Sequence, residues 1–285
     1  MSESPADPAL RRARALDVLW LAGVAATAFA VALALARHVG PLIYLPVGWD
    51  AWFDTDTTRV YEDISQRSSV LSRGSYHPLF GLVGHLPYAV LSALMGTRGF
   101  AVVQLELALV SAALAVVCAA FFRVQGCRRG EALVFTALTI SSAAFVFFAG
   151  IPETFPFGAL SIVAGLLAVA RAERDRRSTL VVGLVSALAT AITVTNVLPI
   201  AAALWWRRKS VSLVRIAAVA AVALAAGVAA QVWIFPRSVL APLQMLGLGA
   251  TSISQPDNVF TGDLVPPRAL RTWGASCARS SCTRR

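Results

Sequence analysis

Acidic, basic and aromatic residues gather in one polar stretch, GWDAWFDTDTTRVYEDISQRSSVLSRGSYHPL, at residues 48–79. It contains Asp54 and Asp56 in a D-T-D arrangement, and Arg73 and His77 lie near its end. Two carboxylates this close in a loop can hold a divalent metal together with a phosphate, or one of them can act as a general base. Arg and His side chains at the far end of the loop can hold a phosphate. These residue types indicate chemistry on a phosphorylated substrate.

The same stretch also suits a loop without chemistry. Asp56 and Thr57 precede the run RVYEDI, so they can simply start an interfacial helix. D-x-D triplets are frequent by chance, and His77 and His85 are suited to anchoring a chain at a membrane interface. Spacing alone leaves both interpretations open.

Two carboxylates lie outside this stretch, at the same expected side of the molecule. Glu106 is within an apolar run, about a third of the way from its outer end, where a carboxylate is costly and normally points into a bundle or cavity. Glu153 lies in the turn GIPETFPFG between two apolar runs, where capping of a new helix is the alternative role. We expect both to converge with the polar stretch.

Composition defines the elements that must position these residues. The chain has 285 residues, is 57% hydrophobic and only 14% charged, and has a positive mean hydropathy. Several runs are long enough to cross roughly 30 Å of hydrocarbon, which predicts an all-α polytopic transmembrane helix bundle. The net charge of +10 comes from Arg clusters between apolar runs. Such clusters act as orientation signals, so we expect membrane lipids and no nucleic acid as partners.

The apolar runs give an expected order along the chain. Residues 1–17 are predicted to be cytoplasmic, residues 18–235 to form the transmembrane domain with a long outer loop at about 37–99, and residues 236–285 to form an outer-facing, irregular and possibly truncated tail. The first apolar run is expected to be an uncleaved anchor of a multi-pass protein of the cell membrane. The expected segments are residues 18–36, 100–122, 132–149, 155–170, 180–206 and 214–235.

Two apolar runs have polar interruptions that affect the topology. Residues 78–95 contain Gly, His and Pro, and they are predicted to lie at the outer interface without spanning. With that choice the Arg clusters within 123–129 and 171–177 both face the cytoplasm. Residues 180–206 contain T-V-T-N and Pro199 near their middle, which predicts two half-helices that return the basic cluster at 207–209 to the same side.

This order of features resembles the C-type integral-membrane glycosyltransferases, in the branch of protein O-mannosyltransferases and lipid A aminoarabinose transferases. The run DTTR at residues 56–59, with Tyr61, is similar to the Asp-Glu-x-Arg-Tyr motif of the first outer loop in that branch. It departs from the motif at Thr57 and by one additional residue before Tyr61. The run HPL at residues 77–79 is similar to an HPPL-type segment, and Glu153 falls where the family often has an acid.

The resemblance implies a hexosyltransferase that moves a sugar from a polyprenyl-phosphate donor to an acceptor at the outer face of the membrane. Asp56 would deprotonate the acceptor, while Arg73 and His77 would stabilise the departing lipid phosphate. A divalent metal on Asp54 and Asp56 is the alternative way to stabilise that phosphate. The catalytic candidates are Asp56, Asp54 and Glu153, and the substrate-binding candidates are Arg73, His77, Tyr61 and Glu106.

Two other classes of function fit the composition. A transporter or flippase-like protein would use Glu106 and the T-V-T-N interruption as a midplane site, although it does not need the polar loop and would normally show two similar halves. An inactive, truncated membrane protein is the third class, because the later helices and the C-terminal soluble region of larger glycosyltransferases have no counterpart in this sequence.

Overall fold

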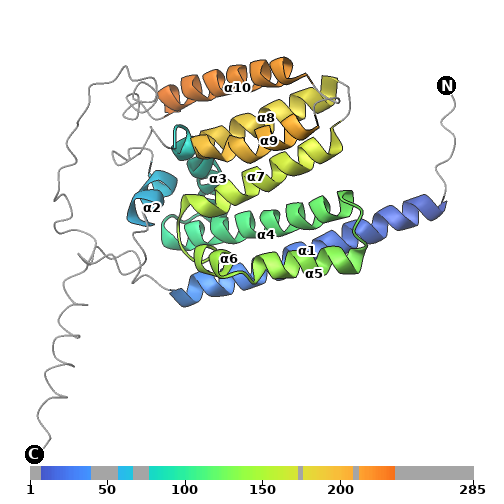
Figure 1. Cartoon of the computed structure of the whole chain (residues 1–285). Coiled ribbons are helices and arrows are strands. Elements are labelled where there is room, and N and C mark those ends of the chain that lie inside the picture. The colour runs from blue at the N-terminus through green and yellow to red at the C-terminus, as the bar shows by residue number, and fades with distance from the viewer. Residues whose placement is uncertain (1–7, 40–56, 67–76, 173–175, 208–211, 235–285) are drawn as a thin grey trace, which may run out of the picture.

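The computed structural model describes residues 8–39, 57–66, 77–172, 176–207 and 212–234. Within these ranges all regular structure is helical, which confirms the predicted all-α bundle (Figure 1). The elements are α1 Pro8–Val39, α2 Thr57–Ser65, α3 Phe80–Met95, α4 Phe100–Val124, α5 Arg129–Ile140, α6 Ala143–Phe148, α7 Thr154–Arg171, α8 Arg176–Ile192, the 3-10 turn η2 Val194–Asn196, α9 Val197–Trp206 and α10 Leu213–Ile234.

Four of the described helices are long and apolar enough to cross a membrane. Their apolar spans are Ala15–His38, Phe100–Val124, Thr154–Arg171 and Leu213–Ile234. Large apolar side chains on several of these helices remain exposed in the isolated chain, as lipid-facing surfaces require. By the length and composition of its helices, the chain is a membrane-embedded protein.

Helix α4 lies at the centre of the bundle, between α1 and α7 (Figure 1). It runs antiparallel to α1, because Gln104 near its start donates a hydrogen bond of 2.6 Å to the carbonyl of Ala36, near the end of α1. At the opposite end of α1, Asp17 accepts a bond of 2.7 Å from Arg129, just beyond α4. Small residues let the two helices approach closely. The fully buried alanines on this pair are Ala28, Ala32, Ala36, Ala108, Ala115 and Ala119.

Arginines occupy one end of the bundle, at the right in Figure 1, where α4, α7 and α9 end and α5, α8 and α10 begin. We call this the basic end. Its described members include Arg123, Arg128, Arg129, Arg171, Arg176, Arg177, Arg207 and Arg215. The opposite end, where α4 and α7 begin, is called the cavity end for the reason given below.

The predicted interruption of residues 180–206 is confirmed. Thr193 has an extended backbone with φ −153° and ψ 131°, and it separates α8 from η2 and α9. Thr and Asn compete for backbone hydrogen bonds, and Pro199 fits only the first turn of a helix. Arg207, after α9, donates a bond of 2.8 Å to the carbonyl of Ala170 near the end of α7. Both outer ends of the broken segment therefore lie at the basic end, as predicted.

Helix α3 stays at the cavity end. Its 16 residues rise by about 24 Å, and it is shorter than the four candidate spans. The Leu79 amide donates to the Ala191 carbonyl at 3.0 Å, and the Gly99 amide donates to the Tyr88 hydroxyl at 2.8 Å. These bonds place its start beside the helix break and tie it to the start of α4. That residues 78–95 lie at the interface without spanning stays a prediction.

The single segment predicted at residues 132–149 is wrong. The structure has two helices there, α5 and α6, separated by Ser141 and Ser142. The Ser142 hydroxyl accepts a bond of 3.2 Å from the Phe145 amide and so caps α6, while the Ser141 hydroxyl donates to the Leu138 carbonyl at 3.3 Å. Serine side chains that bond the local backbone favour helix ends over helix interiors.

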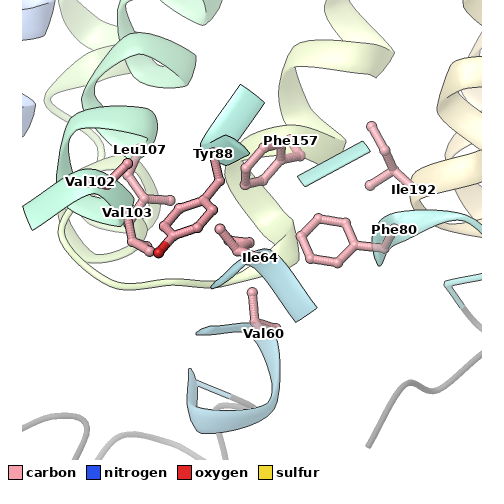
Figure 2. Close-up of a cluster of buried hydrophobic side chains, with 9 residues drawn as sticks. All are labelled: Val60, Ile64, Phe80, Tyr88, Val102, Val103, Leu107, Phe157 and Ile192. Atoms are coloured by element: carbon pink, nitrogen blue, oxygen red, sulfur yellow. The ribbon is translucent and has the colours of Figure 1, made fainter. Parts of the chain in front are cut away.

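A hydrophobic cluster fixes the cavity end and connects five helices (Figure 2). Two of its members, Val60 and Ile64, come from the short amphipathic helix α2, so α2 is docked against the bundle. His85 Nδ1 lies 2.8 Å from the Ile64 carbonyl and completes the end of α2. The buried members are Val60, Ile64, Phe80, Tyr88, Val102, Val103, Leu107, Phe157 and Ile192.

Candidate functional site

A cavity of about 870 Å³ lies among α4, α5, α6, α7 and η2. Its polar residues at the cavity end come from four separate places in the sequence. They include Arg59, His77, Glu153, Thr193, Thr195 and Asn196. Apolar residues line the remainder, among them Leu114, Phe145, Phe148, Ile162 and Val163.

The apolar lining extends along the helices toward the middle of the bundle. On α7 the lining residues run from Thr154 to Val163, nine residues apart, which corresponds to a rise of about 14 Å. On α4 they run from Ser111 to Cys118. The cavity is therefore polar at one end and apolar along its length, so it suits an elongated amphipathic ligand.

Arg59 brings a buried positive charge to the cavity. Its guanidinium donates from Nη1 to Asp63 Oδ2 at 3.2 Å, one turn along α2, and both side chains are almost completely buried. The docking of α2 by Val60 and Ile64 orients this face of the helix. A buried charge of this kind is retained in a protein only when it is paired and hydrogen-bonded.

His77 joins the polar loop to the helix break. Its Nδ1 lies 2.9 Å from the Ile192 carbonyl and 3.1 Å from the Thr193 hydroxyl. Because a carbonyl only accepts, Nδ1 carries the proton in the bond to Ile192, and this bond fixes the orientation of the ring. The carbonyls at the end of α8 have no partner within their own helix. Residues 77–79 supply those partners.

Glu153 is both a helix cap and a cavity residue. It is 3% exposed, and its Oε2 accepts a hydrogen bond of 3.1 Å from the amide of Thr154 at the start of α7. The positive end of α7 offsets part of the carboxylate charge. The capping role and the site role, which the sequence left as alternatives, are therefore combined in one side chain.

Two polar side chains in the cavity were not recognised from the sequence as parts of this site. The Nδ2 atom of Asn196 is buried, and it has no hydrogen-bond partner among the described residues. A Cβ on Gly158 would lie 2.9 Å from this atom, so the absence of a side chain there makes room for the amide. Ser111 is 1% exposed, and its hydroxyl also lacks a partner in the described ranges. The T-V-T-N interruption was a signal for Asn196; Ser111 offered none.

The structure brings together only two of the predicted site residues that it describes, His77 and Glu153. Glu106 is 1% exposed within α4 and does not line the cavity, and neither of its carboxylate oxygens has a partner among the described residues. Tyr61 packs against the hydrophobic cluster of Figure 2 and likewise does not line the cavity. Burial raises the pKa of the Tyr61 phenol.

Three further candidates, Asp54, Asp56 and Arg73, lie outside the described residues. In the chain, Asp56 directly precedes Thr57, the first residue of α2, and is three residues before Arg59. Within the part of the chain that the structure describes, no three His, Cys, Asp or Glu side chains form a group able to hold a metal. The metal alternative concerned Asp54 and Asp56 and stays a prediction.

The geometry defines a membrane-embedded helical protein with one amphipathic cavity at the end of its bundle. The chain matches no family model, no curated protein and no solved structure. The function must therefore be argued from the residues themselves.

Proposed function

We propose that the protein is a membrane glycosyltransferase that moves a sugar from a polyprenyl-phosphate donor to an acceptor at the outer face of the cell membrane. The observation that carries this proposal is the cavity, which joins a polar end to a lining of apolar helices. A polyprenyl-phosphate sugar has the same two parts, a charged headgroup and a long hydrocarbon chain. The motif resemblance at residues 56–61 and 77–79 supports the same class.

The distribution of Arg residues supports an orientation. We place the basic end in the cytoplasm, together with the N-terminus, because clustered Arg and Lys favour that side. The cavity end then faces outward, as expected for a multi-pass protein that uses lipid-linked sugars outside the cell membrane.

In the proposed reaction Asp56 takes the proton of the acceptor hydroxyl. The acceptor oxygen forms a bond to the anomeric carbon with inversion, and the bond from that carbon to the phosphate oxygen breaks. The electron pair leaves with the lipid phosphate, whose charge needs a cation nearby. Arg73 and Arg59 are the proposed cations; a divalent metal on Asp54 and Asp56 is the alternative.

The described part of the site supports this reaction by binding. Glu153 can accept a hydrogen bond from a sugar hydroxyl, and the Thr193 and Thr195 hydroxyls can both donate and accept. His77, four residues after Arg73 in the sequence, is held to the helix break by its bond to Ile192. The apolar residues of α4 and α7 would accommodate the first isoprene units of the donor.

A transporter is the competing proposal, and the arrangement of acids weakens it. It requires Glu106 and the T-V-T-N interruption in one site, but only the interruption lines the cavity. The buried Glu106 is then left without a role in transport.

The test is sugar transfer by the full chain in lipid vesicles, with a panel of radiolabelled polyprenyl-phosphate sugars. We expect transfer from at least one donor, and a loss of about 10²- to 10⁴-fold in Asp56→Asn at unchanged thermal stability. Asp54→Asn serves as the comparison, since rescue of its activity by excess divalent metal would favour the metal alternative. The result that would overturn this proposal is no sugar transfer from any donor together with movement of the donor lipids across the vesicle membrane. That result would favour the transporter.

A further inference from the structure

We propose that Asn196, just before α9, belongs to a subsite that binds the phosphoryl group of a lipid within the cavity. The identity of that lipid as the sugar donor rests on the proposed function. The binding itself does not require any transfer, so it can be tested separately.

The first observation is the buried amide of Asn196. Its Nδ2 can only donate hydrogen bonds, and it has no partner among the described residues. Buried polar atoms are nearly always paired in proteins, so an acceptor oxygen is expected here. Asn196 lines the cavity, and the open space beside Gly158 allows the amide to lie against α7.

The second observation is the pair of helix starts at the same cavity. Both α7, with 18 residues, and α9, with 10, begin at residues that line it or adjoin it. A helix start carries a partial positive charge, but α9 adds few free amides, because the Val197 amide bonds to the Thr195 carbonyl and Pro199 has no N–H. The Glu153 carboxylate already occupies the start of α7. Asn196, at the start of α9, makes no capping bond with its side chain, so its amide remains for a ligand.

The third observation is independent of the helix break. Ser111, on α4, is 1% exposed, lines the same cavity and has a hydroxyl without a partner in the described part of the chain. A purely hydrocarbon occupant would leave this hydroxyl unpaired, at a cost of about 1–3 kcal/mol. An occupant with an oxygen atom in this part of the cavity can pair it.

Charge and shape select a lipid phosphate. The charged groups that line the cavity are Arg59 and Glu153, and the start of α7 offsets part of the charge of Glu153. The charge of Arg59 is shared with Asp63, so the donor Nδ2 of Asn196 is the group that selects an acceptor oxygen. A phosphoryl group near Asn196 leaves the apolar lining of α4 and α7 for a hydrocarbon chain, whereas inorganic phosphate would leave that lining unfilled.

The experiment measures binding of a short polyprenyl monophosphate, without sugar, to the purified full chain in nanodiscs. The unphosphorylated polyprenol and inorganic phosphate are the two comparison ligands. We expect the lipid phosphate to bind at least about 10-fold more tightly than either, in line with bonds to a charged group.

The variants assign this preference to residues. Asn196→Asp keeps the shape of the side chain but adds a negative charge. It is expected to weaken the affinity for the lipid phosphate by about 10- to 100-fold and to leave the affinity for polyprenol unchanged. Ser111→Ala is expected to weaken it by about 3- to 10-fold. Ser186→Ala is the matched control, because this hydroxyl is also buried and lacks a described partner but lies on α8 away from the cavity. It should bind as the wild type does.

A second route covers the case in which Asn196→Asp does not fold. Gly158→Ala retains Asn196 but displaces its amide, since the new Cβ would lie 2.9 Å from Nδ2. Gly158→Ala should also weaken the affinity for the lipid phosphate while leaving the affinity for polyprenol unchanged. Wild-type affinity in a folded Asn196→Asp variant, or in Gly158→Ala if the former is unfolded, would overturn the subsite. Equal binding of polyprenol would do the same, and tighter binding of inorganic phosphate would replace the lipid by the free anion.

The two proposals fail in different ways. If the wild type binds the lipid phosphate selectively but transfers no sugar, the proposed subsite stands and the proposed glycosyltransferase activity is refuted. Transfer by the wild type with unchanged binding in both variants would retain the glycosyltransferase and remove the subsite.

Discussion

The ion pairs at the two ends of the bundle differ in their exposure to solvent. At the basic end the Arg129 and Asp17 side chains form an ion pair of 2.7 Å while remaining 38% and 41% exposed. At the cavity end the Arg59 and Asp63 pair is 3.2 Å long, and the side chains are only 7% and 2% exposed. Exposed pairs contribute little to stability, whereas buried pairs carry a large desolvation cost.

This difference suggests a separate role for each end: orientation in the membrane for the basic end, and the proposed function for the cavity end. Arg residues in water need no geometry to act as topological signals, and they can be exchanged among positions at the basic end. The buried polar groups of the cavity end need specific partners from distant parts of the chain, such as those that His77 finds at Ile192 and Thr193. Burial of polar groups, more than the number of charges, therefore distinguishes the cavity end, where we propose that a ligand binds.

Thiol labelling from one side of the membrane tests whether the two ends of the bundle face opposite sides, and each position should be labelled either completely or not at all. In a chain without native Cys, Gln125→Cys at the basic end and Gln66→Cys near the end of α2 place exposed thiols at opposite ends. An impermeant maleimide added to intact cells should label Gln66→Cys completely and Gln125→Cys only after lysis. Labelling of Gln125→Cys in intact cells would reverse the proposed orientation.

The buried ion pair gives the largest expected effect on stability. Arg59→Met should lower the free energy of unfolding by about 3–5 kcal/mol, because it leaves the Asp63 carboxylate buried without its guanidinium. Arg129→Met, the matched change at the basic end, should cost about 0–1 kcal/mol. Thermal unfolding in detergent measures both. The double variant Arg59→Met/Asp63→Leu should recover most of the loss, and equal losses in the two single variants would contradict the comparison.

His77 gives an intermediate effect. His77→Phe keeps a ring but removes the bonds to Ile192 and Thr193, so we expect a loss of about 1–3 kcal/mol. His38→Phe is the control, since His38 is exposed near the end of α1. Hydrogen exchange should show the loss first at residues 192–196. Unchanged protection there would mean that the break does not depend on residues 77–79.

The smallest effect depends on pH. Burial, and secondarily the nearby Asp63 carboxylate, raises the pKa of Glu62 above its ordinary value. The folded state then binds the proton more tightly than the unfolded state, so this residue favours folding more at pH values below its ordinary pKa and loses that contribution as pH rises through the raised value. Glu62→Gln should therefore raise the thermal midpoint slightly at neutral pH and not at low pH. An equal shift at both pH values would contradict this origin.

The sequence predicted those features in which polarity interrupts an apolar run. The helix break at T-V-T-N stands out because four polar or β-branched residues and a nearby Pro lie within hydrocarbon-like sequence. The division between α5 and α6 does not stand out, since Ser141 and Ser142 are compatible with either a helix or its end. Their local hydrogen bonds decided the outcome.

The candidate site was less predictable, because depth along a helix does not give the face on which a side chain lies. Glu106 and Glu153 are both acids near the cavity end, yet only Glu153 lines the cavity. The packing of α4 between α1 and α7 decides this, and its contact with α1 arises from alanines with no distinctive pattern. The cavity itself depends on the space left beside Gly158 and the α5–α6 junction, which no single run of sequence shows.

The bonds made by residues 77–79 set the order in which the molecule can be completed during synthesis. The His77 side chain bonds to the carbonyl of Ile192, which is synthesised 115 residues later. The Pro78 carbonyl accepts a bond from Gln231, which is synthesised 153 residues later. At roughly 5–20 residues per second, the first delay is about 6–23 s. During that time α3 to α8 are made, and at its end η2 and α9 are still missing. The nascent chain therefore carries Arg59 and His77 before their cavity neighbours Thr193, Thr195 and Asn196 exist.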